Sequence, residues 1–81
     1  ADAGGWWQAP TVIEGLGIGS RCATEEIFGP VLTLHAFEDE ADALAMANAT
    51  PYGLSATVLT HDLARAHRVA AALDVGLVWI N

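Results

Sequence analysis

The stretch GLVWIN, residues 76–81, is a near-continuous apolar run that follows a glycine, and it indicates the fold class of the chain. A strand with apolar side chains on both faces is typical of a parallel sheet, because helices cover both faces of such a sheet. Gly76 leaves the backbone free to turn into this strand. We therefore expect residues 76–81 to form a buried strand.

A helix and a strand are predicted just before this run. Residues 62–73 carry apolar side chains at helical spacing, and either Thr60 or Asp62 can serve as the N-cap. Residues 52–60 contain the β-branched side chains that favour a strand. A strand, a helix and a strand in this order predict a parallel crossover.

The same alternation continues toward the N-terminus. Residues 38–48 begin with acidic side chains, which the helix dipole favours, and Pro51 closes the predicted helix. Residues 31–37 are apolar and β-branched, and they predict a strand that starts after the Gly29-Pro30 turn. The fold class is therefore α/β, with mostly parallel strands in the order β-α-β-α-β.

An irregular, glycine-rich segment is expected to precede these elements. Residues 1–20 are punctuated by glycines, and Pro10 argues against a central strand there. Trp6, Trp7 and the pair Val12-Ile13 are its expected buried points. Residues 21–30 are expected to be extended.

The stretch EEIFGPV, residues 25–31, carries the most informative polar group of the chain. Side chains alternate along extended backbone, so Glu26 and Phe28 are predicted to share a face and Glu25 to point away from it. A carboxylate can accept hydrogen bonds from two ribose hydroxyls while an aromatic ring covers a flat heterocycle. On spacing alone, a surface glutamate beside a core phenylalanine is the alternative.

Composition excludes several classes of partner. Ten acidic residues against three arginines and no lysine give a net charge of −7, which argues against nucleic acid and anionic membranes as partners. The chain has no initiator Met, no signal segment and no apolar run long enough to span a bilayer, so a cytoplasmic parent is expected. Its 81 residues with 53% hydrophobic content suggest a fragment covered by a larger body.

No metal site is predicted. His35, His61 and His67 lack the spacing of a helical metal pair, and a lone Cys22 without an activating base predicts an inert thiol. Residues 15–20 resemble a phosphate-binding loop, but Ser20 stands where the third glycine is needed and neither a preceding strand nor a following helix is expected. We expect a connecting loop.

Several blocks of the sequence stand in the order and spacing of the aldehyde dehydrogenase superfamily's catalytic domain, and the resemblance covers nearly the whole chain. These blocks are Gly4-Gly5-Trp6-Trp7, Pro10-Thr11-Val12, Glu25 to Val31, Ala47-Asn48, Pro51-Tyr52-Gly53-Leu54 and Gly76 to Asn81. Because family members are several times longer, the resemblance implies that residues 1–81 are part of a catalytic domain, with no complete domain boundary inside the chain.

The resemblance also implies site roles. Glu26 matches the family glutamate that holds the nicotinamide ribose, and Phe28 matches the aromatic residue beside the nicotinamide, so the implied cofactor is NAD, with NADP not excluded. The nucleophilic cysteine lies upstream in the family; Cys22 is therefore not the nucleophile, and no catalytic residue lies in this chain. The implied parent is a homo-oligomeric oxidoreductase that converts an aldehyde to a carboxylic acid.

Within the superfamily, the chain looks most like the 2-hydroxymuconic semialdehyde dehydrogenase branch, which implies a role in aromatic catabolism. Betaine-aldehyde-like relatives are the next candidates. Two readings from other classes remain open: a free-standing α/β binding module that keeps the motif, and a non-catalytic truncated remnant. Trp79, like Trp6 and Trp7, is expected in a core or along a substrate tunnel.

Overall fold

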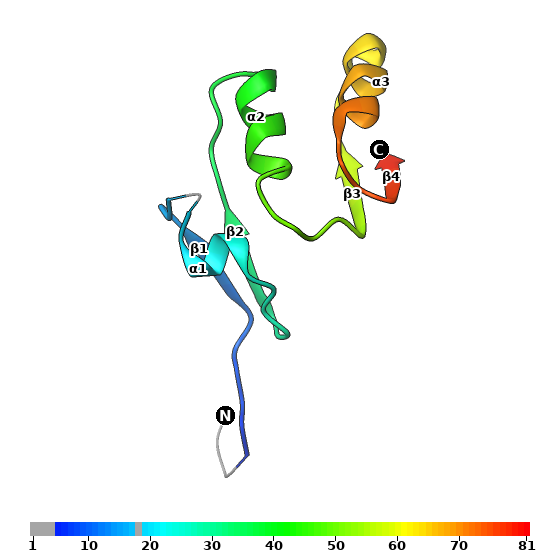
Figure 1. Cartoon of the computed structure of the whole chain (residues 1–81). Coiled ribbons are helices and arrows are strands. Elements are labelled where there is room, and N and C mark those ends of the chain that lie inside the picture. Colours follow the sequence, from blue (N-terminus) through cyan, green and yellow to red (C-terminus); the bar gives the residue numbers. More distant parts are fainter. Residues whose placement is uncertain (1–4, 18) are drawn as a thin grey trace. The chain divides into compact units, whose positions relative to one another are not determined.

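The computed structural model describes residues 5–17 and 19–81, and its strands and helices alternate along the chain (Figure 1). The chain divides into two compact units, Ala1–Ala36 and Phe37–Asn81, which are described separately. Each unit contains one pair of parallel strands. The predicted α/β class with parallel strands is confirmed.

The first unit contains β1 (Thr11–Glu14), α1 (Arg21–Thr24) and β2 (Val31–Leu34). The two strands pair in parallel, with Thr11 opposite Val31. Alternate side chains of both strands are half-buried, whereas the others are exposed. One face of this pair therefore leaves apolar side chains such as Leu32, which is 58% exposed, open to solvent.

Strand β1 corrects the expectation of irregular structure throughout residues 1–20. Pro10 does not prevent the strand because it lies just before the ladder, where its missing N–H removes no strand hydrogen bond. The ladder starts at Thr11, whose N–H donates to the carbonyl of Pro30 at 2.8 Å. The β-branched run that follows favours extended backbone. The expectation for residues 1–4 lies outside the described residues.

Helix α1 corrects the expectation that residues 21–30 are extended throughout. The carbonyl of Ser20 accepts from the N–H groups of Ala23 and Thr24, each at 3.1 Å, and closes a single helical turn. Extended backbone resumes at Glu25, with φ −105° and ψ 147°. Local hydrogen bonding thus overrides the strand preference over one turn.

The second unit contains two helices and two strands: α2 (Glu40–Ala47), β3 (Ser55–Val58), α3 (Leu63–Ala72) and β4 (Leu77–Ile80). Strands β3 and β4 pair in parallel through the α3 crossover, as predicted. In contrast, β2 pairs with β1 and not with β3, so the strands form two separate two-stranded sheets. The sequence did not predict this partition, since it offered no strand at residues 11–14.

Aspartates cap both helices of the second unit. Asp39 accepts from the N–H of Asp42 at 2.8 Å, and Asp62 accepts from the N–H of Arg65 at 3.0 Å. These bonds satisfy N–H groups that have no partner inside the helix. The acidic residues at the start of α2 are therefore helix-start groups, and Asp62 is the N-cap of α3.

Two polar contacts join α2 to α3. Near the start of α2, the carboxylate of Glu40 accepts from both Arg65 and Arg68, with distances of 3.2 Å to Arg65 Nε and 2.6 Å to Arg68 Nε. At the other end, Asn48 donates through Nδ2 to the carbonyl of Ala72 at 3.0 Å. The two helices are thus tied at both ends of α2.

Burial is far lower than the apolar composition suggested. Of the described residues, Ala66 alone is buried, at 3% exposure. Trp6, Trp7, Val12 and Trp79, which were expected in a core or a tunnel, are exposed in this chain. The reason is geometric: a two-stranded sheet with one or two short helices cannot cover both faces of its strands.

The ion pairs of Glu40 should make the stability of the fold depend on pH in the acid range. Its ion-paired hydrogen bond with Arg68, followed by the pairing with Arg65, lowers the pKa of the Glu40 carboxyl from 4.5 to about 2. The folded pKa lies below the unfolded one, so this contribution to stability is fully present above pH 4.5 and is lost as the pH falls toward 2. In the full-length protein, the free energy of unfolding should change less with pH across this range in Glu40→Gln than in the natural sequence. An identical pH response in the two proteins would contradict the pairing.

Candidate functional site

The candidate site lies in the segment that joins α1 to β2. Residues 25–30 contain no helix or strand, and all of them are exposed. One end of the segment is fixed by the helical turn of α1 and the other by the β1–β2 ladder. Two ordered elements of the first unit therefore hold an exposed segment that carries two carboxylates and an aromatic ring.

Glu25 is committed to a local contact. Its carboxylate accepts from Arg21 Nε at 2.9 Å and from Arg21 Nη2 at 3.4 Å. The two residues are four positions apart, and the N–H of Glu25 also donates to the carbonyl of Arg21 at 2.9 Å. This arrangement is the usual helical ion pair, extended to the helix cap. Glu25 is thus a structural residue of the α1 turn.

Glu26, by contrast, has a free carboxylate. Within the part of the chain that the structure describes, no hydrogen bond or ion pair engages its side chain, which is exposed. A carboxylate has only acceptor positions, so this group is suited to bind a ligand with hydroxyl donors. The first carboxylate of the Glu-Glu pair is occupied and the second is available.

Phe28 is 93% exposed, two positions beyond Glu26. The described residues leave the ring uncovered, and its role at a ligand site stays a prediction. An exposed aromatic ring next to an unpaired carboxylate is chemically suited to a ligand that has both a flat ring and hydroxyl groups.

Arg21 is the residue that the sequence reasoning missed. The signal was present, since arginine and glutamate four positions apart are the spacing of a helical ion pair. It was overlooked because the segment was expected to be extended, and in a strand these two side chains would lie far apart. The helical turn of α1 brings them together.

The cysteine and histidine side chains considered in the sequence analysis form no second site among the described residues. Cys22 is a half-buried thiol in α1. His35 contacts Thr33 Oγ1 at 3.1 Å, a local contact within β2 and its exit. No cluster of three or more metal-ligating side chains is found over residues 5–17 and 19–81. Over the same residues, no helix is long and apolar enough to cross a membrane.

The glycine-rich loop at residues 15–20 lies directly between β1 and α1, so the expectation that it would neither follow a strand nor precede a helix is wrong. Ile18 lies outside the described residues. Ser20 still occupies the place of the third glycine, and α1 is a single turn of four residues, too short to align the peptide dipoles of a phosphate site. The loop is a connection.

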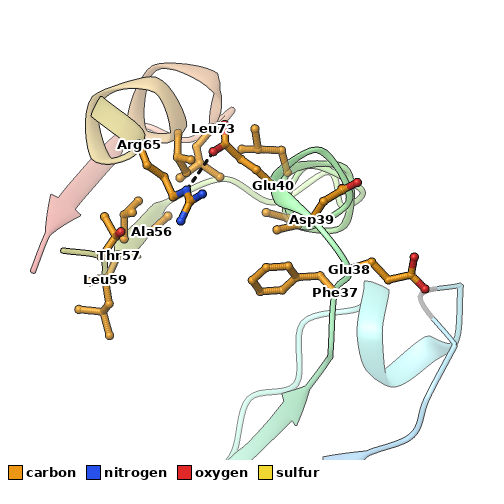
Figure 2. A pocket seen from close by; sticks show the side chains of 15 residues that line it. Phe37, Glu38, Asp39, Glu40, Ala56, Thr57, Leu59, Arg65 and Leu73 are labelled. Carbon is orange, nitrogen blue, oxygen red and sulfur yellow. Dashed lines mark hydrogen bonds and ion pairs between the residues drawn. The ribbon is translucent and has the colours of Figure 1, made fainter. Parts of the chain in front are cut away.

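A separate groove of about 560 Å³ lies within the second unit, between α2, β3 and α3 (Figure 2). Small and apolar side chains form most of its wall, and the ion pair of Glu40 with Arg65 lies at its border. Phe37, which is 59% exposed, contributes a ring where the chain enters α2. The sequence did not predict this groove, because it forms between elements that only the fold brings together.

Comparison with known proteins places this geometry in a family. The sequence profile described as "Aldehyde dehydrogenase family" matches residues 1–81. The chain is 49% identical over 79 residues to 2-hydroxymuconic semialdehyde dehydrogenase of Pseudomonas sp. (strain CF600). This match covers 98% of the chain and 16% of that enzyme. The chain is 52% identical over 77 residues to betaine aldehyde dehydrogenase 1 of Rhizobium meliloti (strain 1021), and this match covers 95% of the chain and 16% of that enzyme.

The fold is similar as well. The crystal structure of betaine aldehyde dehydrogenase from Staphylococcus aureus in complex with NAD+ superposes with a TM-score of 0.85 at 45% identity, over 88% of the chain and 14% of that structure. The chain thus spans about 16% of the length of the curated relatives it matches. Profile, sequence identity and fold agree along nearly the whole chain. It belongs to the aldehyde dehydrogenase family.

Proposed function

We propose that the full-length protein containing this segment oxidises an aldehyde to a carboxylic acid with NAD. We further propose that residues 1–81 are part of its catalytic domain and that Glu26 and Phe28 form the nicotinamide-ribose side of the active site. The observation that carries this assignment is the contrast between the two neighbouring carboxylates: Glu25 is paired with Arg21, whereas Glu26 is exposed and unpaired among the described residues.

The chemistry of the two side chains fits a nicotinamide nucleoside. Two ribose hydroxyls can donate to the Glu26 carboxylate, and the exposed ring of Phe28 can limit where a flat heterocycle lies. NAD, when bound, accepts the hydride that leaves the aldehyde carbon. Glu26 and Phe28 act by positioning, because neither has to exchange a proton with the substrate in this role. The NAD+ complex of the Staphylococcus aureus relative supports NAD as the cofactor.

For the substrate, we propose a 2-hydroxymuconic semialdehyde, as in the Pseudomonas relative. Betaine aldehyde is the second candidate, because the chain is also 52% identical to the Rhizobium meliloti enzyme, although over 77 residues instead of 79. The two aldehydes have opposite charge: the semialdehyde carries a carboxylate and betaine aldehyde a quaternary ammonium group. The ratio of kcat/KM for the two therefore separates the candidates, and a preference for the cation would reject the semialdehyde.

Glu26→Gln tests the cofactor assignment. The amide is the same size but accepts weaker hydrogen bonds, so hydride transfer in the full-length protein should slow by about ten- to a hundredfold. With a deuterated aldehyde, an isotope effect on turnover should appear or grow, because hydride transfer becomes the slower step. Reaction of the catalytic thiol with aldehyde should change little, since that step does not need the nicotinamide ring in place.

Glu25→Gln is the matched control for Glu26→Gln. It makes the same chemical change one residue away and removes only the exposed ion pair with Arg21, whose side chain is 88% exposed. Such surface pairs contribute little, so turnover should remain within about twofold of the natural protein. If Glu25→Gln were the more damaging change, the assignment of the cofactor-facing carboxylate would be wrong.

Cys22→Ser should leave turnover of the full-length protein essentially unchanged. Cys22 is half-buried on the single turn of α1, and the proposed nucleophile lies outside this chain. Labelling of the catalytic thiol in the presence and absence of aldehyde checks the same point independently of turnover. A loss of activity beyond tenfold in a folded variant would identify Cys22 as the nucleophile instead.

The isolated chain of residues 1–81 should neither oxidise aldehydes nor melt cooperatively. It would supply one side of the nicotinamide site without a nucleophile, and its described part buries only Ala66. NADH formation with both candidate aldehydes, together with a thermal melt, checks this. If the isolated chain oxidised an aldehyde, the nucleophile would lie within residues 1–81, and our proposal that it lies elsewhere in the protein would be wrong. A cooperative melt without turnover would favour a free-standing binding module.

A further inference from the structure

Helix α2 is attached to α3 by charged groups at its N-terminal end. Glu40 is the first residue of α2, and its carboxylate accepts two hydrogen bonds from Arg68, at 2.6 Å from Nε and 2.7 Å from Nη2. Arg65 adds a third at 3.2 Å from Nε. Two guanidinium groups of α3 therefore share one carboxylate of α2.

The C-terminal end of α2 is attached by neutral groups. Asn48, the C-cap of α2, donates through Nδ2 to the carbonyl of Ala72 at 3.0 Å. Its Oδ1 accepts from the N–H of Asp74 at 2.9 Å. The amide side chain thus satisfies a carbonyl and an N–H at the end of α3, where the helix itself provides no partner.

Within residues 37–81, little else fixes α2 between these two ends. No residue of α2 is buried, and the groove of about 560 Å³ runs along its inner side, with Leu44 on α2 and Val69 on α3 among its wall residues. Apolar side chains that line an open groove have lost only part of their exposure to water, so they contribute only part of their hydrophobic stabilisation. The two end contacts therefore carry much of the attachment of α2 to α3.

We propose that α2 is a hinged helix, fixed at Asn48 and released at Glu40, so that its first turn unwinds and separates from α3 when ionic strength rises, which widens the groove. The charged groups at the released end are partly solvated: the side chains of Arg65 and Arg68 are 54% exposed and that of Glu40 is 25% exposed. Screening lengths fall from about 10 Å at 0.1 M salt to about 3 Å at 1 M, so salt weakens this contact.

The hinge end does not share this sensitivity. The Asn48 contacts join an amide to backbone groups, and screening by salt acts on net charges rather than on neutral hydrogen bonds. The two ends of one helix therefore respond differently to the same change in solution. This inference does not depend on the proposed function, because it concerns only the second unit.

Two backbone N–H groups report on the two ends separately. The N–H of Ala43 donates to the carbonyl of Asp39 at 3.0 Å in the first turn of α2. The N–H of Asp74 donates to Asn48 Oδ1 at the hinge. In the full-length protein, hydrogen–deuterium exchange at single-amide resolution should accelerate at Ala43 by about five- to tenfold between 0.1 M and 1 M salt, and stay within about twofold at Asp74.

Glu40→Gln should produce the same pattern without added salt. Exchange at Ala43 should be faster by about five- to tenfold and should no longer respond to salt, while exchange at Asp74 stays unchanged. Glu38→Gln is the matched control, because it removes the same charge from an exposed side chain two residues earlier that forms no ion pair with any described residue. It should leave both amides as in the natural protein.

Two results would overturn the proposal. If Ala43 and Asp74 accelerate together in high salt or in Glu40→Gln, α2 detaches as a whole and Asn48 is no hinge. If neither accelerates, the ion pairs do not hold the first turn, and packing against the remainder of the protein does. The salt series needs no variant, so the test stands even where a substitution prevents folding.

Discussion

The second unit depends on the carboxylate of Glu40, which two arginines of α3 share. Small domains are usually held by a buried apolar core, but among the described residues Ala66 alone is buried. The hydrogen bonds between α2 and α3 lie at the two ends of α2. Glu40 fixes the start of α2, and Asn48 fixes its end. The apolar groove lies between these two points.

The end of the β3–β4 pair follows the same principle. The side chain of Asn81 accepts from the N–H of Thr60 at 3.1 Å and donates to its carbonyl at 3.2 Å, and so continues the ladder beyond the last strand residue. At the opposite end, the N–H of Gly76 donates to the carbonyl of Gly53 at 2.9 Å. A Cβ at Gly53 would lie 2.7 Å from the carbonyl oxygen of Asp74, so this approach requires glycine.

In the first unit, a local ion pair distinguishes two neighbouring carboxylates. Glu25 and Glu26 are chemically identical, and the sequence distinguishes them only by alternation along the backbone. The helical turn of α1 adds a physical distinction, since it places Arg21 within 2.9 Å of Glu25 and leaves Glu26 unpaired among the described residues. A weak surface contact is enough for this, because it has only to occupy one group and not to stabilise the fold.

The sequence by itself determined the strands and helices from residue 31 onward and the parallel pairing of β3 with β4, and it limited the cap of α3 to Thr60 or Asp62. These features follow from apolar periodicity, β-branched runs and capping residues, all of which are local. Alternation along extended backbone also predicted that Glu26 and Phe28 share a face. Their cofactor roles and the family came from the resemblance of whole sequence blocks, and the family is confirmed.

Only the tertiary structure decided the partner of β2, the helical turn at Arg21 and the contacts of Glu40. The pairing of β1 with β2 joins residues about twenty positions apart, and the Glu40 contacts join residues 25 and 28 positions apart. Such pairs leave no periodic signal in the sequence. The burial of side chains could not be predicted from the sequence either. Composition gives the number of apolar side chains, whereas their exposure depends on how many layers of helices and strands the fold provides.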